Sequence, residues 1–157
     1  MHAGRVWRKE ETENKMEYAH QYDDKGRQPW VVDIEKTTLE NSNFRTTLWT
    51  GKKLQLTVMS IPVGGEIGLE QHHGIDQFLR IEQGKGLCQM GDAADSLTFE
   101  KEVKDDDAIL VPADKWHNVK NIGDVPLRLY TLYADPDHVA GTVHPTAKDA
   151  ELDPNEE

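Results

Sequence analysis

The sequence predicts an all-β fold, either a sandwich or a barrel, and three observations support this. Through the middle of the chain, apolar and polar residues alternate over short runs, which is the period of a half-buried strand rather than that of a helix. These runs recur about every 8–12 residues, and turn signals rich in Gly, Pro or Asp separate them. The length of 157 residues suits one domain with a hydrophobic core of its own.

The first expected strand covers residues 54–61. Leu56 and Val58 share one of its faces, Met59 and Ile61 share the other, and a Pro-Val-Gly-Gly turn ends it. The same reasoning predicts further strands at residues 67–72, 77–83, 87–90, 97–103, 108–111, 116–120 and 127–133. Helix is expected to be scarce.

Charge and hydrophobicity divide the chain into three parts. Residues 1–30 contain few aliphatic side chains and are expected to form an N-terminal arm, in which residues 5–20 form either a helix or irregular structure. Residues 31–135 contain almost all of the aliphatic periodicity and form the expected barrel. Residues 136–157 form a C-terminal extension, and its end, residues 147–157, has so little to bury that we expect a solvated acidic tail.

Composition excludes several classes of function. The formal net charge of −11 repels phosphate backbones, so nucleic acid and anionic membranes are not expected partners. Cys88 is the one cysteine of the chain, which excludes an intramolecular disulfide framework and a cysteine-rich zinc site. No apolar run reaches the roughly 18 residues of a membrane span, and the first residues lack the apolar region of a signal peptide. We therefore expect a soluble, cytoplasmic protein.

Two histidines, a glutamate and a glutamine lie at the ends of the expected strands. Glu70 and His72 are two residues apart, so both side chains point to one face of a strand, and Gln77 begins the next strand. A hairpin over residues 70–80 would bring these three together, and a closing barrel would add His117 from the opposite side. Two imidazoles and a carboxylate with open positions suit Fe(II) and tolerate Mn, Ni, Co or Zn.

Two stretches resemble the sequence motifs of the cupin superfamily. Residues 64–77 read GGEIGLEQHHGIDQ and resemble the first motif, which continues to Gly84, and residues 112–121 read PADKWHNVKN and resemble the second. The resemblance covers residues 45–135 and is nearest to small single-domain cupins of the mannose-6-phosphate-isomerase-like group. It implies a double-stranded β-helix, or jelly-roll, barrel, and a homodimer in which the N-terminal arm reaches across to the partner.

The resemblance also implies a metal site, with two departures from the family pattern. Alignment on Gly84 places Gln77 where the family has a glutamate, and Glu70 and His72 where it has two histidines. The implied ligands of a divalent ion (Fe, Mn, Ni or Zn) are therefore Glu70, His72, Gln77 and His117. Gln77 either binds the metal directly or only hydrogen-bonds to a metal-bound water. If Glu70 is not a ligand, it is the candidate catalytic base.

Other polar residues near the motifs have simpler interpretations. His73 and Asp76 point away from the expected site, since adjacent strand residues face opposite ways. Only one of Tyr130 and Tyr133 can line the cavity for the same reason. His144 is expected to be an ordinary surface histidine, with closure over the pocket mouth as the alternative.

The sequence favours a metal-dependent enzyme that acts on a small polar molecule held in the barrel. Fe(II) would lead to dioxygenase chemistry, and Zn or Mn would favour isomerisation by proton transfer. A sugar phosphate is a poor candidate substrate, because no cluster of Arg and Lys accompanies the motifs. The alternative is a non-catalytic binding or sensor module, and an assembly scaffold ranks third because it has no use for the ligand cluster.

Overall fold

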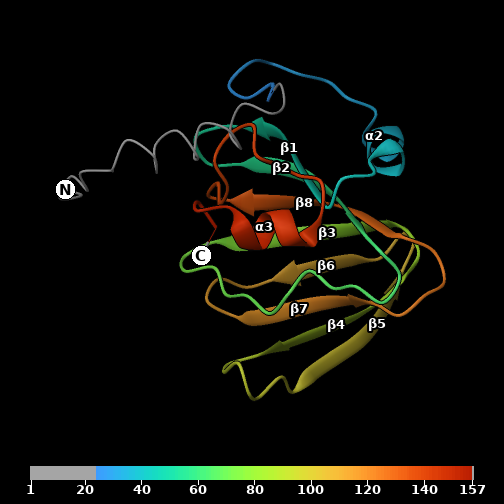
Figure 1. The fold of residues 1–157 in the computed structure, drawn as a ribbon. Helices are drawn as coiled ribbons and strands as arrows, with labels where there is room; N and C mark the ends of the chain where they lie inside the picture. Colours follow the sequence, from blue (N-terminus) through green and yellow to red (C-terminus); the bar gives the residue numbers. More distant parts are fainter. Residues whose placement is uncertain (1–23, 157) are drawn as a thin grey trace.

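The computed structural model describes residues 24–156 and consists of two antiparallel β-sheets with short helices at the periphery (Figure 1). The six-stranded sheet has the order β6-β3-β8-β2-β1-β9, and its strands are β1 (Arg45–Thr50), β2 (Gln55–Ile61), β3 (Asp76–Gln83), β6 (Ala108–Val111), β8 (Leu127–Ala134) and β9 (Val143–His144). The three-stranded sheet has the order β5-β4-β7, with β4 (Lys85–Gly91), β5 (Phe99–Lys104) and β7 (Trp116–Asn121). The all-β, jelly-roll prediction is confirmed.

Most of the predicted strands form, but the segment that carries Glu70 and His72 is not a regular strand. It makes only isolated bridges to β7, between Glu66 and Lys120 and between Glu70 and His117. Three glycines with positive φ interrupt the surrounding chain, Gly64, Gly68 and Gly74. The expected hairpin over residues 70–80 is therefore wrong, since β3 pairs with β6 and β8 instead.

The C-terminal segment was expected to be solvated, and this expectation is wrong for the residues that the structure describes. β9 pairs with β1, with Arg45 opposite His144, and helix α3 (Ala147–Leu152) follows. The side chains of Thr146 and Asp149 form a capping box at the start of this helix. Asp153 is then buried, with 2% of its surface exposed, so the segment packs against the six-stranded sheet instead of fraying.

The sequence analysis predicted neither β1 nor helix α2 (Ile34–Glu40). The inward face of β1 carries Arg45 and Thr47, which are buried but polar, so apolar alternation is absent from it. α2 is short and begins at Asp33, whose carboxylate accepts the backbone N–H of Lys36.

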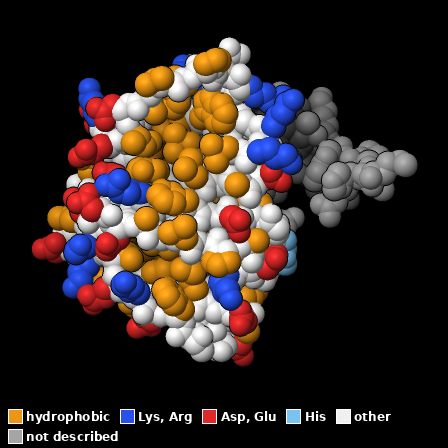
Figure 2. Space-filling view, turned by 180° about the vertical axis from the view of Figure 1, so that it is seen from behind, with side chains coloured by type: hydrophobic (Ala, Val, Ile, Leu, Met, Phe, Trp, Pro, Cys, Tyr) orange, Lys and Arg blue, Asp and Glu red, His pale blue; other side chains and the backbone are white. Residues whose placement is uncertain are grey.

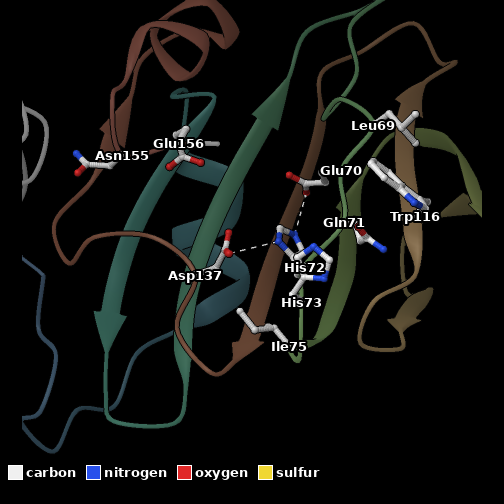
Figure 3. Close-up of a pocket in the computed structure, with 10 residues that line it drawn as sticks. All are labelled: Leu69, Glu70, Gln71, His72, His73, Ile75, Trp116, Asp137, Asn155 and Glu156. Carbon is white, nitrogen blue, oxygen red and sulfur yellow. Dashed lines mark ion pairs between the residues drawn. The ribbon is translucent and has the colours of Figure 1, made fainter. Parts of the chain in front are cut away.

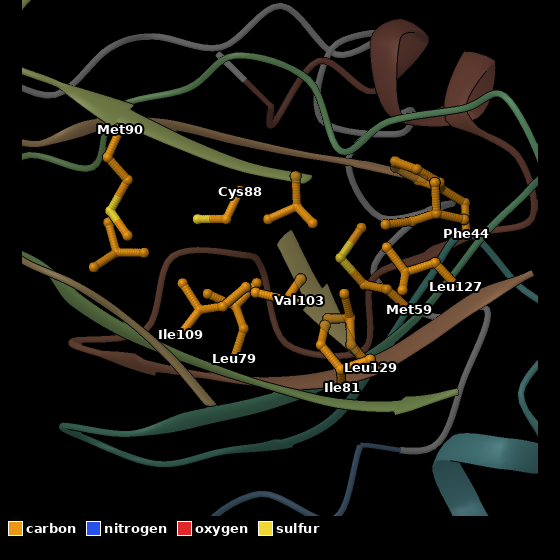
Figure 4. Close-up of a cluster of buried hydrophobic side chains, with 13 residues drawn as sticks. Phe44, Met59, Leu79, Ile81, Cys88, Met90, Val103, Ile109, Leu127 and Leu129 are labelled. Carbon is orange, nitrogen blue, oxygen red and sulfur yellow. The ribbon is translucent and has the colours of Figure 1, made fainter. Parts of the chain in front are cut away.

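The hydrophobic core fills the space between the two sheets (Figure 4). Its side chains come from strands of both sheets and from Phe44, and they are Phe44, Met59, Ile61, Leu79, Ile81, Cys88, Met90, Val103, Ile109, Val111, Val119, Leu127 and Leu129. Cys88 is a packed core residue, with 2% of its surface exposed. Burial of such side chains stabilises the fold by roughly 1.5–3 kcal/mol each, and the core holds β3, β7 and β8 in place beside the polar cluster described below.

Two expectations about the N-terminal part of the chain lie mainly or wholly outside the described residues. The N-terminal arm, residues 1–30, falls there except for its last seven positions, and the candidate helix at residues 5–20 falls there entirely. Within residues 24–156, no helix is both long and apolar enough to cross a membrane.

Candidate functional site

Glu70, His72 and His117 converge between the two sheets. The Glu70 Oε1 atom lies 3.3 Å from His72 Nε2 and 3.4 Å from His117 Nε2. The two imidazole rings are 5.1 Å apart between centroids. One ligand atom from each of the three residues can be chosen so that all lie within 4.8 Å of one another. The structure therefore brings together three of the four residues for which the sequence predicts metal ligation.

Backbone pairing fixes Glu70 against His117. The two residues exchange backbone hydrogen bonds, with N–H to O=C distances of 3.0 and 2.9 Å. His117 Nδ1 lies 2.9 Å from the carbonyl oxygen of Lys115. This contact occupies Nδ1, so Nε2 is the nitrogen that faces Glu70. The bridge between β7 and the irregular segment thus aims the nitrogen at the cluster.

Asp137 approaches His72 from a different direction than Glu70 does (Figure 3). Its Oδ1 atom lies 3.3 Å from His72 Nδ1, and the Tyr133 ring packs edge-on against the imidazole at 5.5 Å. The sequence analysis missed Asp137, because it follows the last expected strand and no motif spacing links it to His72. A carboxylate on the far nitrogen of a metal-binding histidine orients the ring and raises its basicity.

The carboxylates and histidines of this cluster each favour the charged form of the other. Burial alone would raise the pKa of Glu70, but its contacts with His117 and His72 hold that pKa well below the ordinary value. Burial alone would lower the pKa of His72, but Asp137 and Glu70 raise it to about 10. Burial would likewise raise the pKa of Asp137, and His72 and His138 lower it. Both carboxylates are therefore ionised at neutral pH.

Gln77 is buried on β3, with 4% of its surface exposed. Its Nε2 donates to Thr131 Oγ1 at 2.9 Å, which orients the amide. Its Oε1 atom is buried and accepts no hydrogen bond. This carbonyl oxygen is therefore the atom that Gln77 has available for a ligand.

Each of the four predicted ligands has one buried polar atom that lacks a hydrogen-bond partner. These atoms are Glu70 Oε1, His72 Nε2, Gln77 Oε1 and His117 Nε2. A buried polar atom without a partner costs roughly 1–3 kcal/mol, so native proteins rarely leave such atoms unpaired. A carboxylate oxygen, a carbonyl oxygen and imidazole nitrogens are all metal-ligating atoms. The donor set therefore fits a divalent ion.

The residues that the sequence set aside lie as expected. The His73 side chain is exposed, and its Nδ1 lies 3.4 Å from Asp114 Oδ1. Asp76 accepts the backbone N–H of Ala113 at 2.9 Å, a structural role. Tyr133 faces inward with 1% of its surface exposed, and its neighbour on the opposite face, Tyr130, lies outside.

A second polar cluster, formed by Arg45, His138, His144, Asp153 and Glu156, anchors the C-terminal segment. His144 is fully buried, which corrects the expectation of a surface histidine. Arg45 Nη1 donates to His144 Nδ1 at 3.1 Å, and His144 Nε2 donates to Asp153 Oδ2 at 2.8 Å. His138 joins Glu156 Oε1, 2.7 Å from its Nδ1, to Tyr133 Oη, 3.2 Å from its Nε2.

A cavity of about 650 Å³ opens onto the site, and Glu70, His72, Trp116, Asp137 and Glu156 are among its lining residues (Figure 3). A second cavity of about 580 Å³ shares Leu69, Glu70 and Glu156 with the first. The C-terminal segment therefore forms part of the wall of both. A molecule in the first cavity would contact the carboxylate of Glu70 and the ring of His72.

The chain matches one family model, and it is similar to known sequences and solved structures. The family model described as the cupin domain matches residues 57–133. An uncharacterized protein, YrkC of Bacillus subtilis, is 55% identical over 127 residues, which cover 81% of this chain and 68% of YrkC. The crystal structure of BH2720 from Bacillus halodurans has 55% sequence identity and a TM-score of 0.82, and the match covers 83% of this chain and 99% of BH2720.

A more distant structural match agrees on the fold alone. The cupin domain of Cnp3 from Schizosaccharomyces pombe has 22% identity and a TM-score of 0.53, and the match covers 59% of this chain and 64% of that one.

Proposed function

The chain belongs to the cupin superfamily, and on that premise we propose that it binds a divalent metal ion through Glu70, His72, His117 and Gln77. The observation that carries this proposal is that each of these side chains has a buried ligand atom without a hydrogen-bond partner, and that three of them converge. The ion is Fe, Mn, Ni or Zn, since all of these accept imidazole and carboxylate ligands.

A bound ion would act as a Lewis acid and would polarise adjacent oxygens of a small polar molecule. The chain's own residues prepare the site for such a molecule. Asp137 orients His72, the carbonyl of Lys115 orients His117, and Thr131 orients the amide of Gln77. The buried ring of Tyr133 packs edge-on against His72.

We propose that the protein is an enzyme of the isomerase or dioxygenase type. Glu70 lines both cavities and is the candidate base if it does not bind the ion, in which case it would hold or move a proton at Oε1 or Oε2. A non-catalytic binding or sensor module is the second candidate. The neutral Gln77, at a position where the sequence comparison expects a charged glutamate, favours this second candidate.

Metal content measured by mass spectrometry on untagged protein tests the proposal. The wild type is expected to contain near-stoichiometric metal, and a Glu70→Ala, His72→Ala, His117→Ala triple variant is expected to contain none. His73→Ala is the matched control, since this exposed neighbour lies outside the cluster. A wild type that neither contains nor takes up metal would refute the metal site. Turnover that disappears in His117→Ala, with the fold intact, would separate the enzyme from the binding module.

We also propose that the protein forms a homodimer. Hydrophobic side chains gather on the face seen in Figure 2. Residues in register across five strands of the six-stranded sheet form an outward apolar row: Leu110, Phe78, Leu132, Leu56 and Trp49. Leu110 is 70% exposed, and such rows are typical of interfaces. A monomer mass in light scattering would refute the dimer.

The cytoplasmic location stays a proposal from composition.

A further inference from the structure

The charge of the lining residues points to the class of ligand. We propose that the site takes a small chelating molecule without negative charge, either uncharged or cationic, and rejects phosphates and carboxylates. This inference rests on the proposed function, because the molecule would be held beside the metal ion. It goes further by stating which charge is allowed on the part of the molecule that does not bind the metal.

Acidic groups dominate the wall of the first cavity. Glu70, Asp137 and Glu156 line it, whereas no lysine or arginine among the described residues does. Each of the three carboxylates faces a histidine nitrogen: Glu70 Oε1 lies 3.3 Å from His72 Nε2, Asp137 Oδ1 lies 3.3 Å from His72 Nδ1, and Glu156 Oε1 lies 2.7 Å from His138 Nδ1. On the wall of this cavity, three carboxylates therefore stand against the two positive charges of a divalent ion. An anionic group entering here is repelled, whereas a hydroxyl or an ammonium group finds acceptors.

The second cavity does not reverse this balance. It adds Glu66 and Glu151, and its one cationic lining residue among those described is Arg45. Arg45 is 3% exposed, and its Nη1 donates to His144, so the guanidinium offers little surface to a ligand. Its single positive charge offsets only part of the negative charge of the four carboxylates that line this cavity.

The neighbouring lysine is also engaged elsewhere, since Lys115 lines a separate cavity and forms an ion pair with Asp92. The ring of His73, which lines the first cavity, faces Asp114. Trp116, which is half-buried, also lines the first cavity (Figure 3). The face of an indole ring attracts cations, so it adds to the preference of the carboxylates.

Binding of three catechols to the zinc-loaded protein tests the inference. Dopamine, 4-methylcatechol and 3,4-dihydroxyphenylacetate share one chelating diol and differ in the charge of the other end. Calorimetry under nitrogen is expected to give an affinity for 3,4-dihydroxyphenylacetate at least about tenfold lower than for the other two. Glu156→Gln should reduce this difference in affinity. Glu100 is an exposed glutamate on β5, and Glu100→Gln should leave the difference unchanged. Equal or tighter binding of the anionic catechol would overturn the inference.

A second measurement needs neither metal nor catechol binding. Quenching of the Trp116 fluorescence, isolated as the difference between wild type and Trp116→Phe, is compared for caesium and iodide ions. The caesium-to-iodide ratio should exceed that of the urea-unfolded protein by about twofold or more. A ratio equal to or below that reference would overturn the inference. Failure to bind zinc would refute the proposed function only, and the quenching ratio would then decide the inference by itself, as it would if no catechol bound.

Discussion

Replacement of Asp153 by alanine should destabilise the protein strongly, although this residue lies in a segment that composition alone would assign to solvent. Its carboxylate is fully buried and accepts from His144 Nε2 at 2.8 Å. Its other oxygen accepts from the backbone N–H and the side-chain amide of Asn155, at 2.9 and 3.0 Å. Asp153→Ala therefore removes three hydrogen bonds and leaves the His144 ring without its acceptor.

The magnitude follows from the hydrogen bonds that are lost. Burial lowers the pKa of His144, so a neutral ring donates to the Asp153 carboxylate. Hydrogen bonds to a charged group contribute roughly 1.5–3 kcal/mol each, and the two partly buried donors of Asn155 can turn to water, so we expect a loss of about 3–5 kcal/mol. For a chain of 157 residues, about 2–4 °C per kcal/mol converts this to a fall in Tm of roughly 6–20 °C.

Urea unfolding of metal-free protein, followed by circular dichroism, measures the change in the free energy of unfolding. Asp105→Ala is the control, because this acid lies on an exposed turn and its loss should change stability by no more than about 0.5 kcal/mol. A loss below about 1 kcal/mol for Asp153→Ala would refute the reasoning. It would mean that the C-terminal segment does not hold the buried pair described above.

Three further predictions concern the site and the core. Asp137→Asn should weaken metal binding by about 10–100-fold in competition with a chelator, because His72 loses the carboxylate that orients it; unchanged affinity would exclude that role. Burial raises the pKa of Cys88 to about 11, so its thiol should react slowly with a disulfide reagent at pH 8 and rapidly in urea; fast reaction of the native protein would contradict this. The pKa of His72 rises from 6.5 to about 10 on folding, mainly because Asp137 and Glu70 outweigh burial. The stabilisation of the fold by protonated His72 is therefore complete below pH 6.5 and is lost as pH rises toward 10. The urea midpoint of metal-free protein should fall across this window. A midpoint that rises instead would contradict the raised pKa of His72.

Strand positions and ligand candidates could be predicted because they depend on local patterns. β3, β6 and β8 have alternating apolar residues on the face that meets the core, and this signal is present in any short window of sequence. Gln77 and His117 are the second residues of β3 and β7, and both are buried, as the expected strand parity predicted.

Features that depend on distant partners could not be predicted. β1 buries Arg45, which is tolerated because His144 lies opposite to it on β9, 99 residues further along the chain. Asp137 and Asp153 look like solvated acids until the histidines that they contact are placed in space. A buried polar pair leaves no periodic trace in the sequence, since each partner alone resembles a surface residue.

The position of Glu156 has a practical consequence for anyone who prepares this protein. Its carboxylate contacts His138, and its side chain lines both cavities. Any residue appended after position 157 begins within two peptide units, about 8 Å, of that wall. A polyhistidine tag at this end would bring imidazoles to cavities that already contain metal-binding side chains, and it would compete for the same ion. Measurements of metal content and ligand affinity therefore belong on protein whose tag is removed or attached at the other end.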